Sequence, residues 1–187
     1  VYLHSKLVMH GDLKPDNVLL LKDSQEQISC AKVCDFGLSQ TLHHLFPSAI
    51  RGGTAVYKAP EMHIPMEPKT RLLGLAAPQM LAMDVYAFGI VLNEALTGVE
   101  AFEAEVARGI SQQDFVAGVI KGLRPRPIHQ GKLGALISRC WDGNPTQRPT
   151  MAAALEEIEA GGQEAVEAGG RSAAPTRGRN ARSPARR

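Results

Sequence analysis

The sequence of 187 residues predicts an α+β domain that is mainly α-helical and carries one short β-hairpin near its start. Three observations predict this class. Two apolar runs, residues 18–21 and 28–34, flank a polar turn, as paired strands do. A strongly apolar helix is predicted over 82–96, and amphipathic helical patterns follow it as far as residue 160. The hydrophobic content of 44% allows such a chain to bury a real core.

Residues 1–9 have the pattern of a helix end, and they lead into a polar loop at residues 10–17. The loop places an acid, a cation and an amide at fixed steps, as Asp12, Lys14 and Asn17. Phosphoryl transfer to a hydroxyl needs a carboxylate that orients the hydroxyl, an ammonium that neutralises the phosphate and oxygen ligands for Mg²⁺. The same residue types also form ordinary turns, so this loop alone leaves both interpretations open.

The predicted hairpin follows this loop directly. Residues 18–21 form a continuous apolar run before a turn cluster, and we expect them to be a buried strand. Residues 28–34 are the expected partner strand. Such a hairpin brings Asn17 and Asp35 to one end, where both side chains can face one metal ion.

The loop with His10, Asp12, Lys14 and Asn17, together with Asp35-Phe36-Gly37, resembles the catalytic loop and Asp-Phe-Gly segment of the protein kinase family. The resemblance covers residues 1–160 and implies the C-terminal lobe of the kinase fold, with ATP and Mg²⁺ as cofactors and a protein as substrate. It implies that Asn17 and Asp35 ligate Mg²⁺ and that Leu19 lies under the adenine ring, although Leu19 also fits simple core packing. We expect His10 to be structural and to pack near Phe36.

The segment from Gly53 to Glu61 resembles the family's substrate-docking and Ala-Pro-Glu region. The resemblance places the hydroxyl of Thr54 between Asp12 and Lys14, which favours serine or threonine acceptors over tyrosine. It also implies that Glu61 forms a buried ion pair with Arg148. The surrounding residues 38–58 are predicted to be a loop, in which the adjacent histidines 43 and 44 are solvated and not metal ligands.

The remaining elements complete the predicted lobe. Residues 62–81 are longer than the family norm and form a small insertion without a legible function. In the helix at 82–96, Asp84 is implied to contact the catalytic-loop backbone, and an N-cap role is compatible with that. Further helices are predicted at 101–123, 133–141 and 151–160. Residues 140–150 most resemble the tyrosine-kinase-like group, whose members are often serine/threonine kinases.

Charge separates the predicted domain from its tail. Residues 161–187 carry six arginines against Glu164 and Glu167, a net +4, which leaves −2 of the overall +2 on residues 1–160. The tail has almost no large apolar side chain, and we expect it to be disordered. A nucleic-acid or membrane contact led by this tail is the weakest of three functional hypotheses, because the domain offers no basic face to extend it.

The three cysteines match no metal-site spacing and favour free thiols in a reducing, cytoplasmic compartment. The longest apolar run, 85–92, is too short to be a transmembrane segment. The chain opens on Val1 with the pattern of a helix that is already under way, and we expect it to be a piece of a longer protein.

Two departures from the family limit the resemblance. Gly11 stands where the family usually has an arginine that receives an activating phosphate. The sequence also has no G-x-G-x-x-G loop, and with the catalytic loop starting at residue 10 it has no room for an N-terminal lobe. The leading hypothesis is therefore a serine/threonine kinase present as its C-terminal lobe and inactive without the N-terminal lobe. The alternative is a non-catalytic kinase-like binding module.

Overall fold

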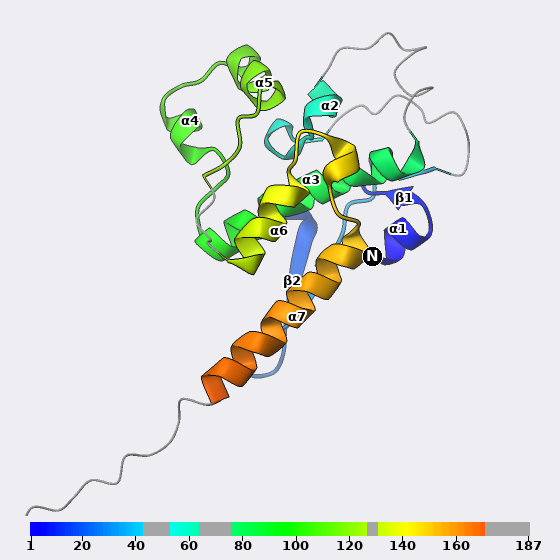
Figure 1. The fold of residues 1–187 in the computed structure, drawn as a ribbon, viewed down its shortest axis with the longest axis vertical. Helices are drawn as coiled ribbons and strands as arrows, with labels where there is room; N and C mark the ends of the chain where they lie inside the picture. The colour runs from blue at the N-terminus through cyan, green and yellow to red at the C-terminus, as the bar shows by residue number, and fades with distance from the viewer. Residues whose placement is uncertain (43–52, 64–75, 127–130, 171–187) are drawn as a thin grey trace, which may run out of the picture.

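The computed structural model describes residues 1–42, 53–63, 76–126 and 131–170, with only the backbone described for 162–170 (Figure 1). The predicted mainly helical α+β architecture is present. The strands are β1 (Val8–Met9), β2 (Val18–Lys22), β3 (Ile28–Val33) and β4 (Gln40–Thr41). The helices are α1 (Tyr2–Ser5), α2 (Pro60–His63), α3 (Ala77–Thr97), α4 (Glu103–Ala107), α5 (Gln112–Ile120), α6 (Lys132–Cys140) and α7 (Met151–Gly170). Short 3₁₀ turns are η1 (Pro15–Asn17), η2 (Ala55–Tyr57) and η3 (Pro145–Gln147).

Helix α3 is the centre of the molecule, and α6, η3, β1 and η2 all pack against it. It begins at Ala77, earlier than the predicted start at residue 82. Pro78 is tolerated because the first-turn N–H groups have no partner inside the helix, and the Gln79 Oε1 accepts a hydrogen bond from the Ala76 N–H at 2.9 Å. The helix ends at Gly98, whose φ of 67° is left-handed.

By length and composition alone, α3 is the one helix of the described chain that could cross a membrane. However, 56% of its apolar window is buried inside the protein. The residues that make it apolar on most faces, such as Val85, Tyr86 and Ile90, are almost completely enclosed by neighbouring elements. Its hydrophobicity is therefore that of a core helix.

The core beside α3 is built from Tyr86 and the aromatic residues of the later helices. Two guanidinium groups pack against the Tyr86 ring, with the Cζ of Arg124 5.1 Å and the Cζ of Arg148 5.2 Å from the ring centroid. Burial raises the pKa of Tyr86 to about 12, although both cations oppose that shift. Phe102 and Phe115 meet edge to face at 4.9 Å and attach α4 and α5 to this core.

Helices α3 and α6 pack against each other at Gly89, and a methyl group there is expected to separate them. A Cβ atom at position 89 would lie 2.7 Å from the Cβ of Cys140. Gly89→Ala should therefore lower the free energy of unfolding by about 1–3 kcal/mol, as overpacked cores do, in a urea titration. Gly161→Ala is the matched control, because Gly161 is also helical and a Cβ there meets nothing within 4 Å. The control should gain up to about 1 kcal/mol from helix propensity, and equal responses of both variants would refute the contact.

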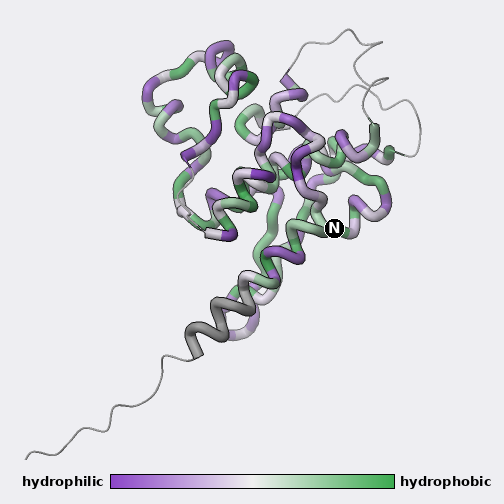
Figure 2. Tube along the Cα trace, in the orientation of Figure 1, coloured by the Kyte–Doolittle hydropathy of each residue, from purple (hydrophilic) through white to green (hydrophobic). Residues whose placement is uncertain are grey.

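Two antiparallel pairs make up the strands of the described chain. The β1–β4 pair joins Met9 to Gln40, although residues 38–58 were predicted to be a loop throughout. The β2–β3 hairpin was predicted correctly, with Val18 opposite Val33. Its predicted burial was wrong: Leu19 and Leu20 are 53% and 56% exposed, because no described element covers the hairpin. Figure 2 shows β2 as an apolar stretch of the trace.

The final helix corrects a second prediction. Helix α7 was expected to end at residue 160 but extends to Gly170, so residues 161–170 are helical and not disordered. This stretch has two alanines and two glutamates against four glycines, so its own propensity does not favour a helix. The helix continues into it from residues 151–160, where four alanines and three glutamates are strong helix formers. The disorder predicted for 171–187 lies outside the described residues, as do the histidines 43 and 44 and most of the 62–81 insertion. The domain boundary predicted at residue 160 stays a prediction.

Candidate active site

The loop at residues 10–17 is fastened to α3 by Asp84. One carboxylate oxygen of Asp84 accepts the His10 N–H at 2.8 Å, and the other accepts the Gly11 N–H at 2.9 Å. The His4 Nε2 lies 2.9 Å from the same carboxylate. Because α3 begins at Ala77, Asp84 lies well inside the helix and is not its N-cap. Its side chain instead orients two successive amides of the loop, as the family resemblance implied.

His10 supports this loop from inside. It is 2% exposed, and its ring meets Phe36 at 5.2 Å, so the predicted packing is present. The Nε2 lies 3.0 Å from the Cys34 carbonyl oxygen, and the Nδ1 accepts the Asp12 N–H at 3.3 Å. A neutral ring with its proton on Nε2 satisfies both contacts. His10 therefore joins Asp12 to the strand that leads to Asp35.

Gly11 is required by its backbone geometry. Its φ is +82°, in the left-handed region that glycine adopts without strain. A Cβ atom at this position would also lie 2.9 Å from the carbonyl oxygen of Leu38. A side chain at residue 11 would have to displace that backbone, which gives a physical reason for the glycine at this position.

Asp12, Lys14 and Thr54 form one cluster. The Lys14 ammonium donates to the Thr54 hydroxyl at 3.0 Å and lies 3.5 Å from the Asp12 carboxylate. The Thr54 N–H donates to the other oxygen of Asp12 at 2.9 Å. Asn17 joins the cluster through its Nδ2, which donates to the Asp12 carbonyl oxygen at 2.8 Å and lies 3.4 Å from its carboxylate. These contacts hold an acid and an ammonium side by side, and both remain partly exposed.

The hairpin brings Asn17 and Asp35 to one end, as predicted. The Cys34 N–H donates to the Asn17 carbonyl oxygen at 2.9 Å, directly beyond the Val18–Val33 pair. Asp35 has a left-handed φ of 59°, and its carboxylate accepts the Gly37 N–H at 3.2 Å. Among the described residues no group of three His, Cys, Asp or Glu could hold a metal alone. An Mg²⁺ ion at Asn17 and Asp35 would thus need further oxygen ligands, which phosphates supply.

The predicted ion pair between Glu61 and Arg148 is present. Two nitrogens of Arg148 donate to the two oxygens of Glu61 at 2.6 and 2.8 Å. The guanidinium also donates to the carbonyl oxygens of Ala82 and Asp142, both at 2.9 Å. The side chain of Arg148 is fully buried, so this one residue joins α2, α3 and the segment before α7.

Tyr57 is a site neighbour that sequence reasoning missed. Its hydroxyl donates to the Glu94 carboxylate, 3.1 Å from each oxygen, and Glu94 also accepts the Ala101 N–H at 2.6 Å. Burial, and then the charge of Glu94, raise the pKa of Tyr57. The contact ties the segment after Thr54 to the end of α3. His4 was also missed, because its partner Asp84 is distant in sequence and no local spacing signals the pair.

The comparisons with known proteins agree with this geometry. The sequence model of the protein kinase domain matches residues 1–158, and the chain therefore belongs to the protein kinase family. It is 36% identical over 159 residues to the serine/threonine/tyrosine-protein kinase HT1 of Arabidopsis thaliana. It is 33% identical over 163 residues to the serine/threonine-protein kinase STY46 of the same plant and 31% over 162 residues to the probable serine/threonine-protein kinase gdt4 of Dictyostelium discoideum.

Each of these matches covers 84% of this chain. The chain spans only 36% of the length of HT1, 24% of STY46 and 9% of gdt4. The similarity therefore concerns one part of each relative.

Proposed function

We propose that this chain is the C-terminal lobe of a protein kinase that transfers the γ-phosphate of ATP to serine or threonine hydroxyls of proteins. The arrangement of Asp12, Lys14 and Thr54 carries the proposal, because it holds a carboxylate and an ammonium 3.5 Å apart beside one threonine. The Thr54 hydroxyl contacts Lys14, as the resemblance implied, but Asp12 is contacted by the Thr54 N–H and not by the hydroxyl. A chain that only bound partners would have no chemical need for this geometry. The serine/threonine kinases among the relatives support the same acceptor class.

In the proposed reaction Asp12 orients the acceptor hydroxyl and takes its proton. The Asp12 carboxylate also accepts the Thr54 N–H, and this hydrogen bond keeps it aligned with the segment on which a substrate would lie. Lys14 stabilises negative charge on the transferred phosphoryl group. Thr54 fixes the Lys14 ammonium by accepting its hydrogen bond.

The residues present fit one side of a site for ATP and Mg²⁺. The side-chain Nδ2 of Asn17 donates to Asp12, so the side-chain oxygen of Asn17 is the atom suited to a metal. The carboxylate of Asp35, which accepts only the Gly37 N–H, is suited in the same way. Leu19 is 53% exposed on the adjoining strand and would lie under the adenine ring. When bound, ATP supplies the phosphoryl group and Mg²⁺ neutralises part of its charge.

We further propose that the chain transfers phosphate negligibly alone and needs an N-terminal lobe. No G-x-G-x-x-G segment occurs in the sequence to cover the phosphates. The exposed leucines of β2 support this proposal, since they form an apolar surface that a second lobe would bury. We also propose that the kinase belongs to the tyrosine-kinase-like group, on the resemblance of residues 140–150 to that group. The three free cysteines support a proposed intracellular, reducing location.

The acceptor class is tested with peptide libraries that carry serine, threonine or tyrosine as the single hydroxyl residue. The natural protein that contains residues 1–187 should phosphorylate the serine and threonine libraries and not the tyrosine library. Thr54→Ala removes the hydroxyl that holds Lys14 and should slow transfer about tenfold, the equivalent of one hydrogen bond. Thr54→Ser keeps the hydroxyl and should retain the rate. Faster transfer to tyrosine would contradict the proposed class, and no transfer to any library would favour the binding module.

A further inference from the structure

A second ammonium group, that of Lys58, lies beside the candidate active site. Lys58 comes directly after η2, and its side chain is half-buried. Its Cε lies 3.1 Å from the point that a Cβ atom of Gly53 would occupy, and a carboxylate oxygen of Asp12 lies 3.5 Å from the same point. The end of the Lys58 side chain and the carboxylate proposed to orient the acceptor hydroxyl therefore meet at one side of Gly53.

The backbone that carries Lys58 is held in place on both sides. The Lys58 N–H donates to the Ala55 carbonyl oxygen at 3.3 Å and closes the η2 turn. Immediately before Lys58, the Tyr57 hydroxyl is bound to Glu94. Immediately after it, Ala59 is fully buried. The stem of Lys58 thus begins on a fixed segment, which lowers the entropic cost of binding a ligand there.

The acids that lie around Lys58 are already bound by other groups. Asp12 and Asp84 line the same small void as Lys58. The Asp12 carboxylate accepts the Thr54 N–H and lies beside Lys14. The two oxygens of Asp84 hold backbone N–H groups of the loop at residues 10–17. Neither acid therefore serves as the partner of Lys58.

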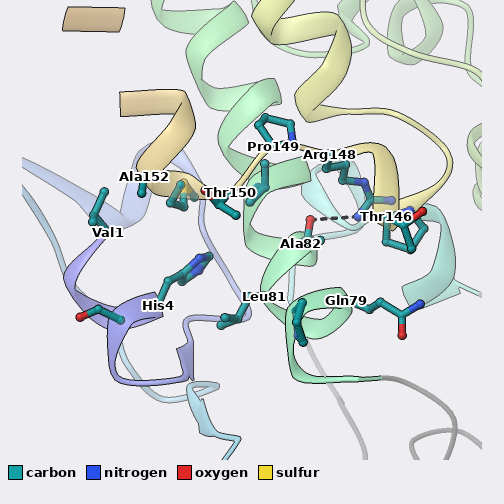
Figure 3. Close-up of a pocket in the computed structure, with 15 residues that line it drawn as sticks. Val1, His4, Gln79, Leu81, Ala82, Thr146, Arg148, Pro149, Thr150 and Ala152 are labelled. Carbon is teal, nitrogen blue, oxygen red and sulfur yellow. Dashed lines mark hydrogen bonds between the residues drawn. The ribbon is translucent and has the colours of Figure 1, made fainter. Parts of the chain in front are cut away.

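Glu61, the acid nearest to Lys58 in the sequence, is occupied as well. It is paired with Arg148, whose further hydrogen bond to the Ala82 carbonyl oxygen is drawn in Figure 3. Among the residues that the structure describes, no carboxylate lies within ion-pair distance of the Lys58 ammonium. Lys58 therefore presents a positive charge that the described part of the chain does not compensate.

The neighbouring imidazole of His63 does not add a second charge at neutral pH. Burial lowers the pKa of His63, and the charge of Lys58 lowers it further. The imidazole is therefore neutral at pH 7, and the positive charge at this end of α2 is that of Lys58. An anionic group would be attracted to this position, whereas a cationic group would be repelled.

We propose that Lys58 selects protein substrates that carry an aspartate or a glutamate within two residues of the acceptor hydroxyl. The inference rests on the proposed function, which places the acceptor hydroxyl at Asp12. Successive residues of an extended peptide are about 3.8 Å apart, so a residue one or two positions from the acceptor can reach Lys58. Its carboxylate would form a charge-assisted hydrogen bond with the ammonium, and the partial burial of Lys58 limits screening by water.

Binding is measured by fluorescence anisotropy, with the natural protein that contains residues 1–187 and labelled peptides in which alanine replaces the acceptor. Each peptide has a single aspartate at one of the two positions before or after this alanine, and its partner peptide has asparagine at the same position. For at least one position, the wild type should bind the aspartate peptide about tenfold more tightly than its partner, the effect of one hydrogen bond to a charged group.

Two lysine variants show whether the preference comes from Lys58. Lys58→Met keeps an unbranched apolar stem and removes the charge, so it should bind both peptides of each pair equally. Lys121→Met is the matched control, because Lys121 is exposed at the end of α5 and does not line the void beside Asp12. This control should keep the tenfold preference of the wild type.

A wild type that prefers aspartate at none of the four positions would overturn the inference, as would a preference that Lys58→Met retains. Because these peptides have no acceptor hydroxyl, the result does not depend on phosphoryl transfer. A preference that depends on Lys58, in a protein that phosphorylates neither the serine nor the threonine library, would support the acidic-peptide site and overturn the proposed kinase reaction. The two failures are therefore distinguishable.

Discussion

Replacing Asp12 with asparagine is expected to reduce phosphoryl transfer to a serine peptide by about 10²–10⁴-fold, the usual contribution of a positioned general base. Asparagine has nearly the same shape and can still accept the Thr54 N–H, so the loop should keep its structure. It cannot take a proton from the acceptor hydroxyl at neutral pH. The rate is measured with ATP in the natural protein that contains residues 1–187.

Asp16→Asn is the matched control for this substitution. Asp16 is an exposed acid on the same loop, and no role in the proposed reaction depends on it. Its rate should stay close to that of the wild type. Two variants with the same activity would contradict the role of Asp12, whereas a selective loss at Asp12 with unchanged ATP affinity would support it.

Arg148→Met should destabilise the domain by about 3–5 kcal/mol, the range for breaking one side of a buried ion pair. The substitution leaves the Glu61 carboxylate unpaired at a site where it is only 15% exposed. It also removes the donors that satisfy the Ala82 and Asp142 carbonyl oxygens. Urea unfolding of wild type and variant measures the difference, and the double variant Glu61→Met with Arg148→Met should recover part of it.

The exposed pair Lys22–Glu26 provides the control for this prediction. Its atoms are 2.9 Å apart, but the side chains are 56% and 80% exposed. Water screens such a pair, so Glu26→Gln should change the free energy of unfolding by less than about 0.5 kcal/mol. An Arg148→Met variant as stable as this control would show that the buried pair does not hold the helices together.

The features that sequence predicted best depend on neighbouring residues or on a strong family motif. The hairpin followed from two apolar runs around a turn, and the helix within 77–97 from its continuous apolar pattern. The contacts of Asp84 with His10 and Gly11, and of Glu61 with Arg148, followed from the resemblance to protein kinases. No local pattern would have paired these distant residues.

The errors concern properties that depend on packing or on non-local contacts. Continuous hydrophobicity in β2 predicted burial, but a sequence pattern cannot tell which element covers a strand, and Leu19 is exposed. The predicted start of the central helix at residue 82 was too late, because the first turn of α3 contains Pro78 and proline fits the first turn of a helix. The β1–β4 pair is two residues long on each side and leaves no periodic signal.

The most direct test of the central claim is the sequence of the natural transcript upstream of the codon for Val1. The proposed C-terminal lobe requires an in-frame glycine-rich phosphate loop and a strand lysine within roughly 100–150 upstream residues, the remaining share of one domain. Finding both would support a complete kinase in which Asp12 acts. A transcript that begins at or near Val1 would contradict the account and favour a kinase-like module that acts by binding.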